Sequence, residues 1–416
     1  MAPSGKRPVG NADRLSDLPD GLIHSIMAFL TAREAVQTCV LSRRWEDLWC
    51  SMPCLDIDER QFHVIGSRAY YEVWDDMSED EDDIDSASLE EFVNNLLMFH
   101  SAPRLDRFRF HVASSHGNTK FVNSWIRRGV KRCPKVVEIH STDGCKLPHL
   151  GGSSSSRLNR LHLTGITLDK TFTQQLRSTC PVLDDLELRR CRLDGHTEIV
   201  SFTLNKLTIV DCTTNNPSAL TIKAPSLTYL QLVITALDRN WQAVVVNQMT
   251  RLNKATICLK DSTAMLPCKL LSSLMFAEDL QLTGLRTLAN LHIGSGTFPV
   301  FCSVRILLLD KCDLSDSCDI LGNFLNNAPY LEKLTLQQCK LPECSKKSKA
   351  GGNVERTSLQ CQETPSFQCL RLKRTEIKYD EDDDVQKLFD LLLGIWRNLQ
   401  KSTIVIKKAS RSYSMM

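Results

Sequence analysis

Stretches of the form L-x-x-L-x-L decide the fold of this chain, and three successive ones show the pattern. Residues 183–188 read LDDLEL, residues 204–209 read LNKLTI and residues 227–232 read LTYLQL. The last two apolar residues of each stretch are two positions apart, which in a β-strand puts them on the same face. A short strand cannot bury its apolar face alone, so we expect neighbouring stretches to stack and bury these faces together.

The same stretch recurs along most of the chain. Successive starts are 21 to 36 residues apart, and most steps lie in the window of roughly 20–29 residues that is typical of leucine-rich repeats. The pattern predicts the α/β fold class: a leucine-rich-repeat solenoid whose curved parallel sheet has a helical or irregular outer side. The regular stretches start at Leu105, Leu158, Leu183, Leu204, Leu227, Ala277, Val304, Leu331 and Phe367, and two irregular ones start at Val136 and Leu252.

The chain has 416 residues and 17 cysteines, an odd number with no C-x-x-C pair. This usage favours free thiols in a reducing intracellular compartment, nuclear or cytoplasmic, over a disulfide framework or a zinc site. The repeat register turns Cys258 and Cys369 outward. The repeat consensus has Asn or Cys three residues after the last Leu, a position where we expect structural packing of Cys191, Cys212, Cys312 and Cys339.

Charge and motif content exclude several classes of protein. With 51 Lys+Arg against 49 Asp+Glu, the chain lacks the basic excess of a general nucleic-acid binder. It has no run of 18 apolar residues that would predict a membrane span. None of the common phosphate-binding, zinc-protease or nucleophile-elbow motifs occurs. We therefore expect a non-catalytic protein with no cofactor and no metal.

Residues 18–49 have a different, helical periodicity. Leu22, Ile26 and Phe29 recur at helical spacing after Pro19, which is tolerated in a first helical turn. Residues 31–34 read TARE, a capping box that predicts the start of a second helix. A third helix is expected around Trp45, Leu48 and Trp49. So small a unit has more apolar surface than it can bury itself, and it either packs on the rest of the chain or docks a partner.

This segment resembles the F-box motif in the style found among plant F-box proteins. The resemblance rests on about 40 residues, including Leu18-Pro19, Leu22-Ile23 and Ser42-Arg43-Arg44-Trp45. It implies binding to a Skp-type adaptor, which links an F-box protein to a cullin-based ubiquitin ligase. The positions that it implies for adaptor contact, or for holding the contacting helices together, are Leu18, Pro19, Leu22, Ile23, Ile26, Val36, Val40 and Trp45.

These patterns divide the chain into five segments. The helical segment and the repeats are separated by a connector that has an acidic run at residues 79–85 and ends in an amphipathic helix signal. After the last repeat, a strand–helix–strand signal, with the helix at residues 385–399 and the closing strand at 403–406, is consistent with a cap over the final core layer, and it weakly resembles the FBD region of some plant F-box proteins. The expected boundaries are 1–12 for a flexible tail, 13–55 for the F-box, 56–100 for the connector and helix, 101–378 for the solenoid and 379–416 for the cap.

Residues beside and between the two strand Leu of each repeat should point outward and form a binding face. At its N-terminal end Arg107, Arg109 and Arg160 are suited to an acidic or phosphorylated segment. Apolar residues at outward positions are candidates for anchoring a protein substrate, and here these are Ile306, Leu308 and Tyr229. The alternative is that a neighbouring loop covers them.

The resulting hypothesis is a substrate-recognition subunit of an SCF-type (Skp–cullin–F-box) ubiquitin ligase, whose F-box docks the adaptor and whose repeats bind the target. Two other functions compete with it. One is a leucine-rich-repeat scaffold with no role in degradation. The other is an RNA- or phosphate-binding solenoid, which the balanced charge and the small number of outward aromatic residues disfavour.

Overall fold

The computed structural model of the chain contains two compact units, Met1–Leu183 and Asp184–Met416, and each is described by itself. The acidic run at residues 79–85 and the helix expected at 385–399 lie outside the described residues. The structure describes residues 17–62, 86–112, 119–142, 145–150, 155–195, 198–214, 220–235, 245–247, 249–260, 266–286, 291–292, 298–314, 319–340, 369, 371–379 and 403–408.

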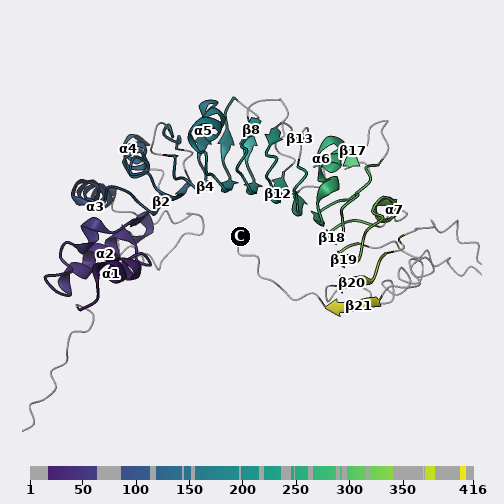
Figure 1. Cartoon of the computed structure of the whole chain (residues 1–416), viewed down its shortest axis with the longest axis horizontal. Helices are drawn as coiled ribbons and strands as arrows, with labels where there is room; N and C mark the ends of the chain where they lie inside the picture. Colours follow the sequence, from purple (N-terminus) through teal and green to yellow (C-terminus); the bar gives the residue numbers. More distant parts are fainter. Residues whose placement is uncertain are drawn as a thin grey trace, which may run out of the picture. The chain divides into compact units, whose positions relative to one another are not determined.

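Unit 1 begins with short helices and continues into parallel strands (Figure 1). Its main strands pair in the order β1-β2-β3-β4, all parallel. Its helical elements are α1 (Asp20–Met27), α2 (Ala32–Gln37), η1 (Thr38–Val40), η2 (Leu48–Ser51), η3 (Glu59–Phe62), α3 (Ser86–Phe99), α4 (Thr119–Val130) and α5 (Thr171–Thr179), and its strands are β1 (Cys54–Asp58), β2 (Arg107–Val112), β3 (Val136–Ser141), β4 (Arg160–Thr164) and β5 (Thr167–Leu168).

Unit 2 is a stack of parallel strands with short elements on the outer side of the sheet (Figure 1). Its main sheet runs β6-β9-β12-β14-β16-β18-β19-β20-β21: Asp185–Arg189, Lys206–Val210, Tyr229–Ile234, Lys254–Leu259, Asp279–Thr283, Ile306–Asp310, Lys333–Gln337, Arg374–Tyr379 and Thr403–Lys408. The outer elements are β7 (Arg192–Leu193), β8 (Glu198–Val200), β10 (Thr213–Thr214), β11 (Thr221–Lys223), β13 (Val245–Asn247), β15 (Leu266–Pro267), α6 (Cys268–Ser273), η7 (Leu274–Phe276), β17 (Leu291–His292) and α7 (Asp319–Asn326).

The predicted fold class is confirmed, because each strand buries alternate residues and aligns them with its neighbours. On β12, Leu230 and Leu232 are buried while Gln231 between them is half-buried. In register, Leu230 pairs with Leu207 on one side and Ala255 on the other. The core is therefore a ladder of apolar side chains that runs through the stacked strands, as expected of a leucine-rich-repeat solenoid.

The turn that follows a strand explains why the cysteines recur at the same position within the repeat. Asp211 has a φ of 52°, and this left-handed residue turns the next side chain, Cys212, into the core. The Cys212 thiol lies 3.4 Å from the carbonyl oxygen of Leu188 in the previous repeat. The turns before Cys191, Cys312 and Cys339 likewise have a left-handed residue, which is Arg190, Lys311 or Gln338, and the turns after β4 and β16 use Gly165 and Gly284. Cys191, Cys212 and Cys312 are buried and Cys339 is half-buried, so the predicted structural packing is confirmed.

The register expected for the last repeat was wrong. The stretch starting at Phe367 predicted outward positions at Arg371 and Lys373, but the strand that pairs with β19 is β20, which begins at Arg374. The core positions are therefore Thr375 and Ile377. The apolar pattern missed this strand because a Thr occupies a position that is usually Leu. The corrected register also explains why Cys369 is buried and not outward, whereas Cys258 is half-buried on the outward face as predicted.

Two more strands differ from expectation at the N-terminal end. β1 pairs with β2 residue for residue, with Leu55 opposite Phe108 and Ile57 opposite Phe110. The chain thus enters the sheet at the expected boundary between the F-box and the connector, one strand earlier than the pattern predicted. The irregular repeat expected from Val136 is also displaced, because Val136 itself is an outward residue paired with Arg107. Its core residues are Val137 and Ile139.

Candidate functional site

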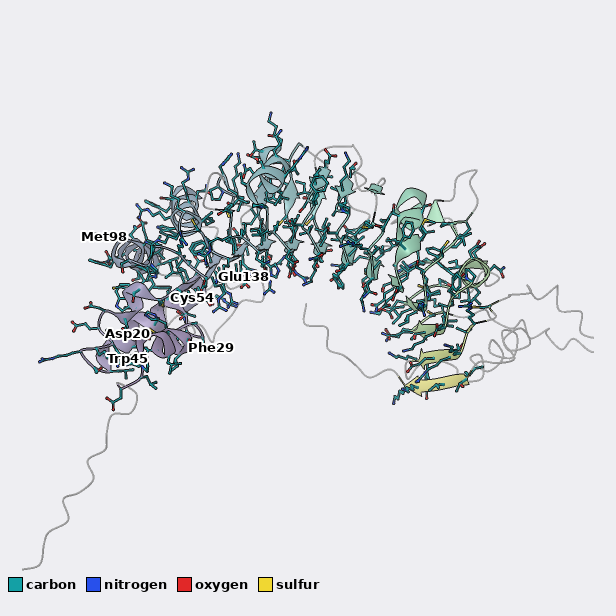
Figure 2. All side chains as sticks on the ribbon, viewed as in Figure 1. Asp20, Phe29, Trp45, Cys54, Met98 and Glu138 are labelled. Atoms are coloured by element: carbon teal, nitrogen blue, oxygen red, sulfur yellow. The ribbon has the colours of Figure 1, made fainter. Side chains whose placement is uncertain are left out.

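The short helices of unit 1 expose an unusual amount of apolar side chain. On α1, Leu22 is 53% exposed and Ile26 is 44% exposed, while Ile23 and Met27 on the opposite face are fully buried. Phe29, just after the helix, is 91% exposed (Figure 2). Leu22, Ile26 and Phe29 follow the spacing that places residues on one side of a helix. Val40 and Leu41 form a second exposed pair after α2.

The structure therefore sorts the residues that the F-box resemblance selected into two groups. Pro19, Leu22, Ile26 and Val40 are exposed, and Leu18 and Val36 are half-buried, so these six are available for contact. Ile23 and Trp45 are buried in the core of unit 1, at 0% and 2% exposure, and they hold the helices together. Phe29 and Leu41 were missing from the selected set, although the paired apolar residues 29–30 and 40–41 were a signal for them.

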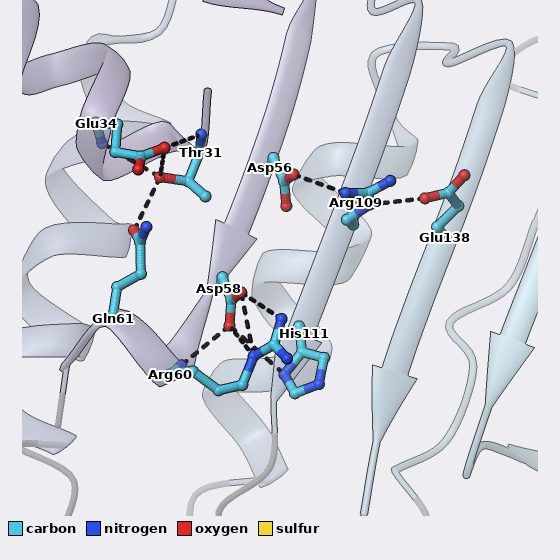
Figure 3. Close-up of polar contacts among 9 residues, drawn as sticks. All are labelled: Thr31, Glu34, Asp56, Asp58, Arg60, Gln61, Arg109, His111 and Glu138. Carbon is cyan, nitrogen blue, oxygen red and sulfur yellow. Dashed lines mark hydrogen bonds and ion pairs between the residues drawn. The ribbon is translucent and has the colours of Figure 1, made fainter. Parts of the chain in front are cut away.

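The exposed helices are held in place by a network of polar contacts (Figure 3). The predicted capping box at the start of α2 is present: Thr31 N–H donates to Glu34 Oε2 at 2.9 Å, and Glu34 N–H donates to Thr31 Oγ1 at 3.3 Å. Thr31 Oγ1 also lies 2.9 Å from Gln61 Oε1. The Arg33 guanidinium lies 4.7 Å from the ring centre of Phe62. These contacts tie α2 to η3, directly after β1.

The third helix predicted around Trp45 forms only in part. The segment from Thr38 to Ser51 consists of the 3₁₀ helices η1 and η2 with turns between them. Trp45 is nevertheless buried and Leu48 is 9% exposed, so the apolar residues at this spacing do face the core. The His24 ring nitrogen Nε2 lies 3.2 Å from the Leu48 carbonyl oxygen, which ties α1 to this segment.

The exposed helices are joined directly to the repeat strands. The backbone N–H of Asp106 donates to the carbonyl of Pro53 at 2.7 Å, and that of Ser101 donates to Cys50 at 2.7 Å. The Arg107 guanidinium, on β2, donates to the carbonyl of Ala28 at the end of α1. The exposed helices and the first repeat strands therefore belong to one packed unit and not to two domains on a flexible linker.

His100 connects the end of α3 to the same contact region between the helices and the repeat strands. Its Nε2 lies 3.0 Å from the carbonyl of Met52, and its Nδ1 faces the guanidinium of Arg132. Burial and the nearby Arg132 charge lower the pKa of His100 to about 4. In the neutral ring, Nε2–H donates to the carbonyl and Nδ1 accepts from Arg132, so neutral His100 satisfies both partners.

We predict that His100 makes the stability of unit 1 depend on pH. Because its folded pKa is lower than the unfolded value, the unfolded chain binds more protons below pH 6.5, and stability falls as the pH falls toward 4. Between pH 7.5 and pH 5 the expected loss is about 2 kcal/mol. Urea unfolding of the wild type and of His100→Gln at both pH values measures it. A loss of the same size in the His100→Gln protein would assign the effect to other groups.

At the N-terminal end of the outward face, one of the predicted arginines is already paired. Arg109 on β2 lies between two carboxylates on neighbouring strands, 3.1 Å from Asp56 and 2.7 Å from Glu138 (Figure 3). Burial raises the pKa of Asp56 despite Arg109. Burial also opposes ionisation of Glu138, but its hydrogen bond from Arg109 holds the pKa below the usual value. Arg107 is half-buried and Arg160 is exposed, so Arg160 is the most accessible of the three predicted cations.

The predicted substrate anchors lie on the outward face of unit 2 but not all together. Ile306 is 39% exposed, and Leu308, two positions on along β18, is half-buried. Tyr229 is in the same row as Ile306, but Lys254 and Asp279 lie between them and form an ion pair at 3.0 Å. The Tyr229 hydroxyl lies 3.1 Å from Gln231 Oε1. Ile306 and Leu308 therefore make one apolar spot, and Tyr229 is separate from it.

Two further features bear on the class of protein. Within the described residues, no helix is long and apolar enough to cross a membrane, and no group of three or more His, Cys, Asp or Glu side chains could hold a metal ion. What the structure does provide is an exposed apolar helical surface joined to a stack of repeat strands. Exposed apolar surfaces of this kind are typical of protein interaction sites.

Comparison with known proteins agrees with this class. The F-box domain model matches residues 15–56, and the model described as "At1g61320/AtMIF1, LRR domain" matches residues 80–382. The "MEIOTIC F-BOX protein MOF" of Oryza sativa subsp. japonica is 32% identical, with 95% of this chain and 88% of that protein aligned. The chain belongs to the plant F-box/leucine-rich-repeat family, whose members are typically non-catalytic adaptor proteins.

Two relatives from Arabidopsis thaliana have similar lengths. The "F-box/FBD/LRR-repeat protein At1g78750" is 27% identical over 78% of this chain and 77% of its own length. The "FBD-associated F-box protein At4g10400" is 26% identical, again over 78% of this chain and 77% of its own length. The FBD-like cap at residues 379–416 stays a prediction, although the closing strand expected at residues 403–406 is present as β21.

Proposed function

We propose that this protein is the substrate-recognition subunit of an SCF-type ubiquitin ligase. The observation that carries the proposal is the exposure of Leu22 and Ile26 on one side of α1 and of Phe29 just after it, within residues that match the F-box domain. Exposed apolar patches of this kind are typical of protein interaction sites. The F-box domain implies a Skp-type adaptor as the partner of this surface.

In this proposal the chain carries out no ubiquitin transfer itself. Its F-box recruits the adaptor and the cullin, other subunits supply the chemistry, and the repeats hold the target. The 13 cysteines whose side chains the structure describes as free thiols support a site of action in a reducing compartment, the nucleus or the cytoplasm.

Co-purification tests the proposal most directly. The full chain, tagged and expressed in plant cells, should bring down a Skp-type adaptor and a cullin. The Leu18→Ala/Pro19→Ala chain should bring down much less of both. Recovery of neither protein by the wild type would contradict the ligase function. Recovery of both, with no change in the half-life of any bound protein when the adaptor is lost, would favour the non-degradative scaffold.

We predict that the double substitution Ile306→Asp/Leu308→Asp abolishes target capture while adaptor binding remains. The reason is that burying two carboxylates against an apolar surface of the target costs far more than the apolar contact stabilises. Quantitative mass spectrometry of proteins that co-purify with each chain measures the effect. Phe202→Asp is the matched control, because Phe202 is 65% exposed but lies outside the strands. Unchanged target capture by the double variant would show that the target binds another part of the protein.

A further inference from the structure

The outward face of unit 2 changes from net neutral to basic between its middle and its last strands. On β12, β14 and β16, the charged outward residues are Lys254 and Asp279, which pair with each other at 3.0 Å. On β18, the outward residues are Ile306, Leu308 and Asp310. The strands that follow bring four cations onto the same face: Lys333, Arg374, Lys378 and Lys407.

One buried carboxylate holds three of these cations. Glu376 is 6% exposed, and its carboxylate oxygens lie 3.5 Å from Lys333, 3.9 Å from Arg374 and 3.1 Å from Lys407. The hydrogen bond from Lys407 holds the pKa of Glu376 below its usual value, so the group is ionised. A single negative charge opposes three positive ones, and a positive excess remains at the surface.

The fourth cation adds to this excess. Lys378 lies in the row that joins Asp310, Gln337 and Lys407, and its Nζ is 3.3 Å from the uncharged Gln337 Oε1. Among the outward positions of the described strands β18 to β21, Asp310 is the only carboxylate besides Glu376. Four cations against two carboxylates leave a net charge of +2 on this part of the face.

The apolar spot and the basic strands lie at a defined spacing. Ile306, Lys333 and Arg374 are consecutive members of one row across the sheet. Neighbouring strands are about 4.8 Å apart, so Arg374 lies about 10 Å from Ile306 across the strands. An extended peptide rises about 3.3 Å per residue, and this distance equals about three residues of such a peptide.

We propose that this face binds an extended target segment in which an aliphatic or aromatic residue is followed, about three residues later, by two or more Asp or Glu. The apolar side chain contacts Ile306 and Leu308, and the carboxylates lie against Arg374, Lys378 and Lys407. The inference rests on the proposed function, since it names the kind of target that the ligase subunit recognises. A single-stranded nucleic acid fits the face less well, because such ligands need aromatic residues for base stacking, and no outward position on the described strands β18 to β21 is aromatic.

Peptide selection on the purified full chain tests the proposal. Random nine-residue peptides, unphosphorylated and displayed on phage, should yield sequences with an apolar residue and acidic residues at the stated spacing. A selected peptide should bind more weakly when its acidic residues are changed to Asn or Gln, and more weakly at 500 mM than at 50 mM NaCl, because salt screens exposed charges. Selected sequences with no acidic preference would overturn the proposal, as would tight binding of a single-stranded RNA with none of the peptides.

A charge-reversal pair locates the binding site. Lys378→Glu should lower the affinity for the selected peptide by about tenfold or more, since it replaces an attractive charge with a repulsive one. It leaves the three ion-pair partners of Glu376 in place, which are Lys333, Arg374 and Lys407. Arg251→Glu makes the same charge change at an exposed residue just before β14 and should leave affinity unchanged. Equal weakening by both variants would contradict the assigned site.

The outcome is separable from that of the ligase proposal. Peptide binding is measured on the chain alone, and adaptor binding is measured by co-purification. An adaptor that binds, together with peptides that lack acidic preference, would contradict only the proposed target segment. Acidic peptides that bind a chain unable to recruit an adaptor would contradict only the ligase assignment.

Discussion

The double substitution Leu22→Asp/Ile26→Asp is expected to weaken binding of a Skp-type adaptor by at least about 100-fold, because truncating a hot-spot residue at the centre of an interface costs about 2 kcal/mol or more. Both side chains are more than 40% exposed on α1, so the change should leave the core of unit 1 intact. A carboxylate at either position would have to be desolvated against the apolar surface of the partner. Isothermal titration calorimetry with a purified plant Skp-type adaptor measures the effect.

Met98→Asp is the matched control for this prediction. Met98 is 74% exposed near the end of α3, in the same unit but outside the residues that match the F-box domain (Figure 2). The substitution introduces the same carboxylate and should leave adaptor affinity within about twofold of wild type, since surface changes away from an interface have small effects. If Met98→Asp lowered the affinity for the adaptor and the double variant did not, the docking surface would lie on α3.

Phe108→Ala should cost unit 1 about 3–5 kcal/mol, the usual range for removing a buried Phe side chain. Phe108 on β2 is fully buried, stacks on Phe110 with ring centres 6.2 Å apart, and faces Leu55 of β1 in register. Its loss leaves a cavity between the first repeat strands and α4. Hydrogen–deuterium exchange measured by mass spectrometry should show faster exchange in Thr119–Val130 and in β2.

Gly129 provides an internal check on this packing. A Cβ at Gly129 would lie 2.3 Å from the Phe108 ring, so Gly129→Ala should destabilise the protein even though Ala is the better helix former by about 1 kcal/mol. In the double variant Gly129→Ala/Phe108→Leu the smaller side chain makes room. We expect it to cost less than the sum of the two single changes. Strict additivity would show that the two residues do not act through this contact.

The sequence was sufficient for the fold because the apolar period of two identifies strands wherever Leu, Ile or Phe fills the core positions. The prediction failed where a residue of another type fills a core position. Because Thr375 occupies a core position of β20, the last repeat was predicted in the wrong register. Cys369 was therefore predicted to be outward. β1 was missed because its core residues Leu55 and Ile57 lie at the expected boundary between the F-box and the connector, where the helical pattern dominated the interpretation.

The site was predictable in composition but not in exposure. The F-box pattern selected Ile23 and Ile26 alike, yet Ile23 is fully buried and Ile26 is 44% exposed. Only packing against the rest of unit 1 decides between them, because α1 has apolar residues on two faces. Arg109 was likewise predicted to be a cation available for binding. The carboxylates that neutralise it, Asp56 and Glu138, come from strands 53 and 29 residues away.

The pairing of β1 with β2 has a practical consequence for experiments that trap targets. A truncated chain that begins after residue 58 would remove β1 and expose the unpaired edge of β2, whose backbone groups pair with Leu55 and Ile57 in the whole protein. Exposed strand edges of this kind promote aggregation, and aggregates retain proteins indiscriminately. The full-length Leu22→Asp/Ile26→Asp chain keeps that edge covered. It should therefore serve as the better decoy, able to hold its targets without delivering them.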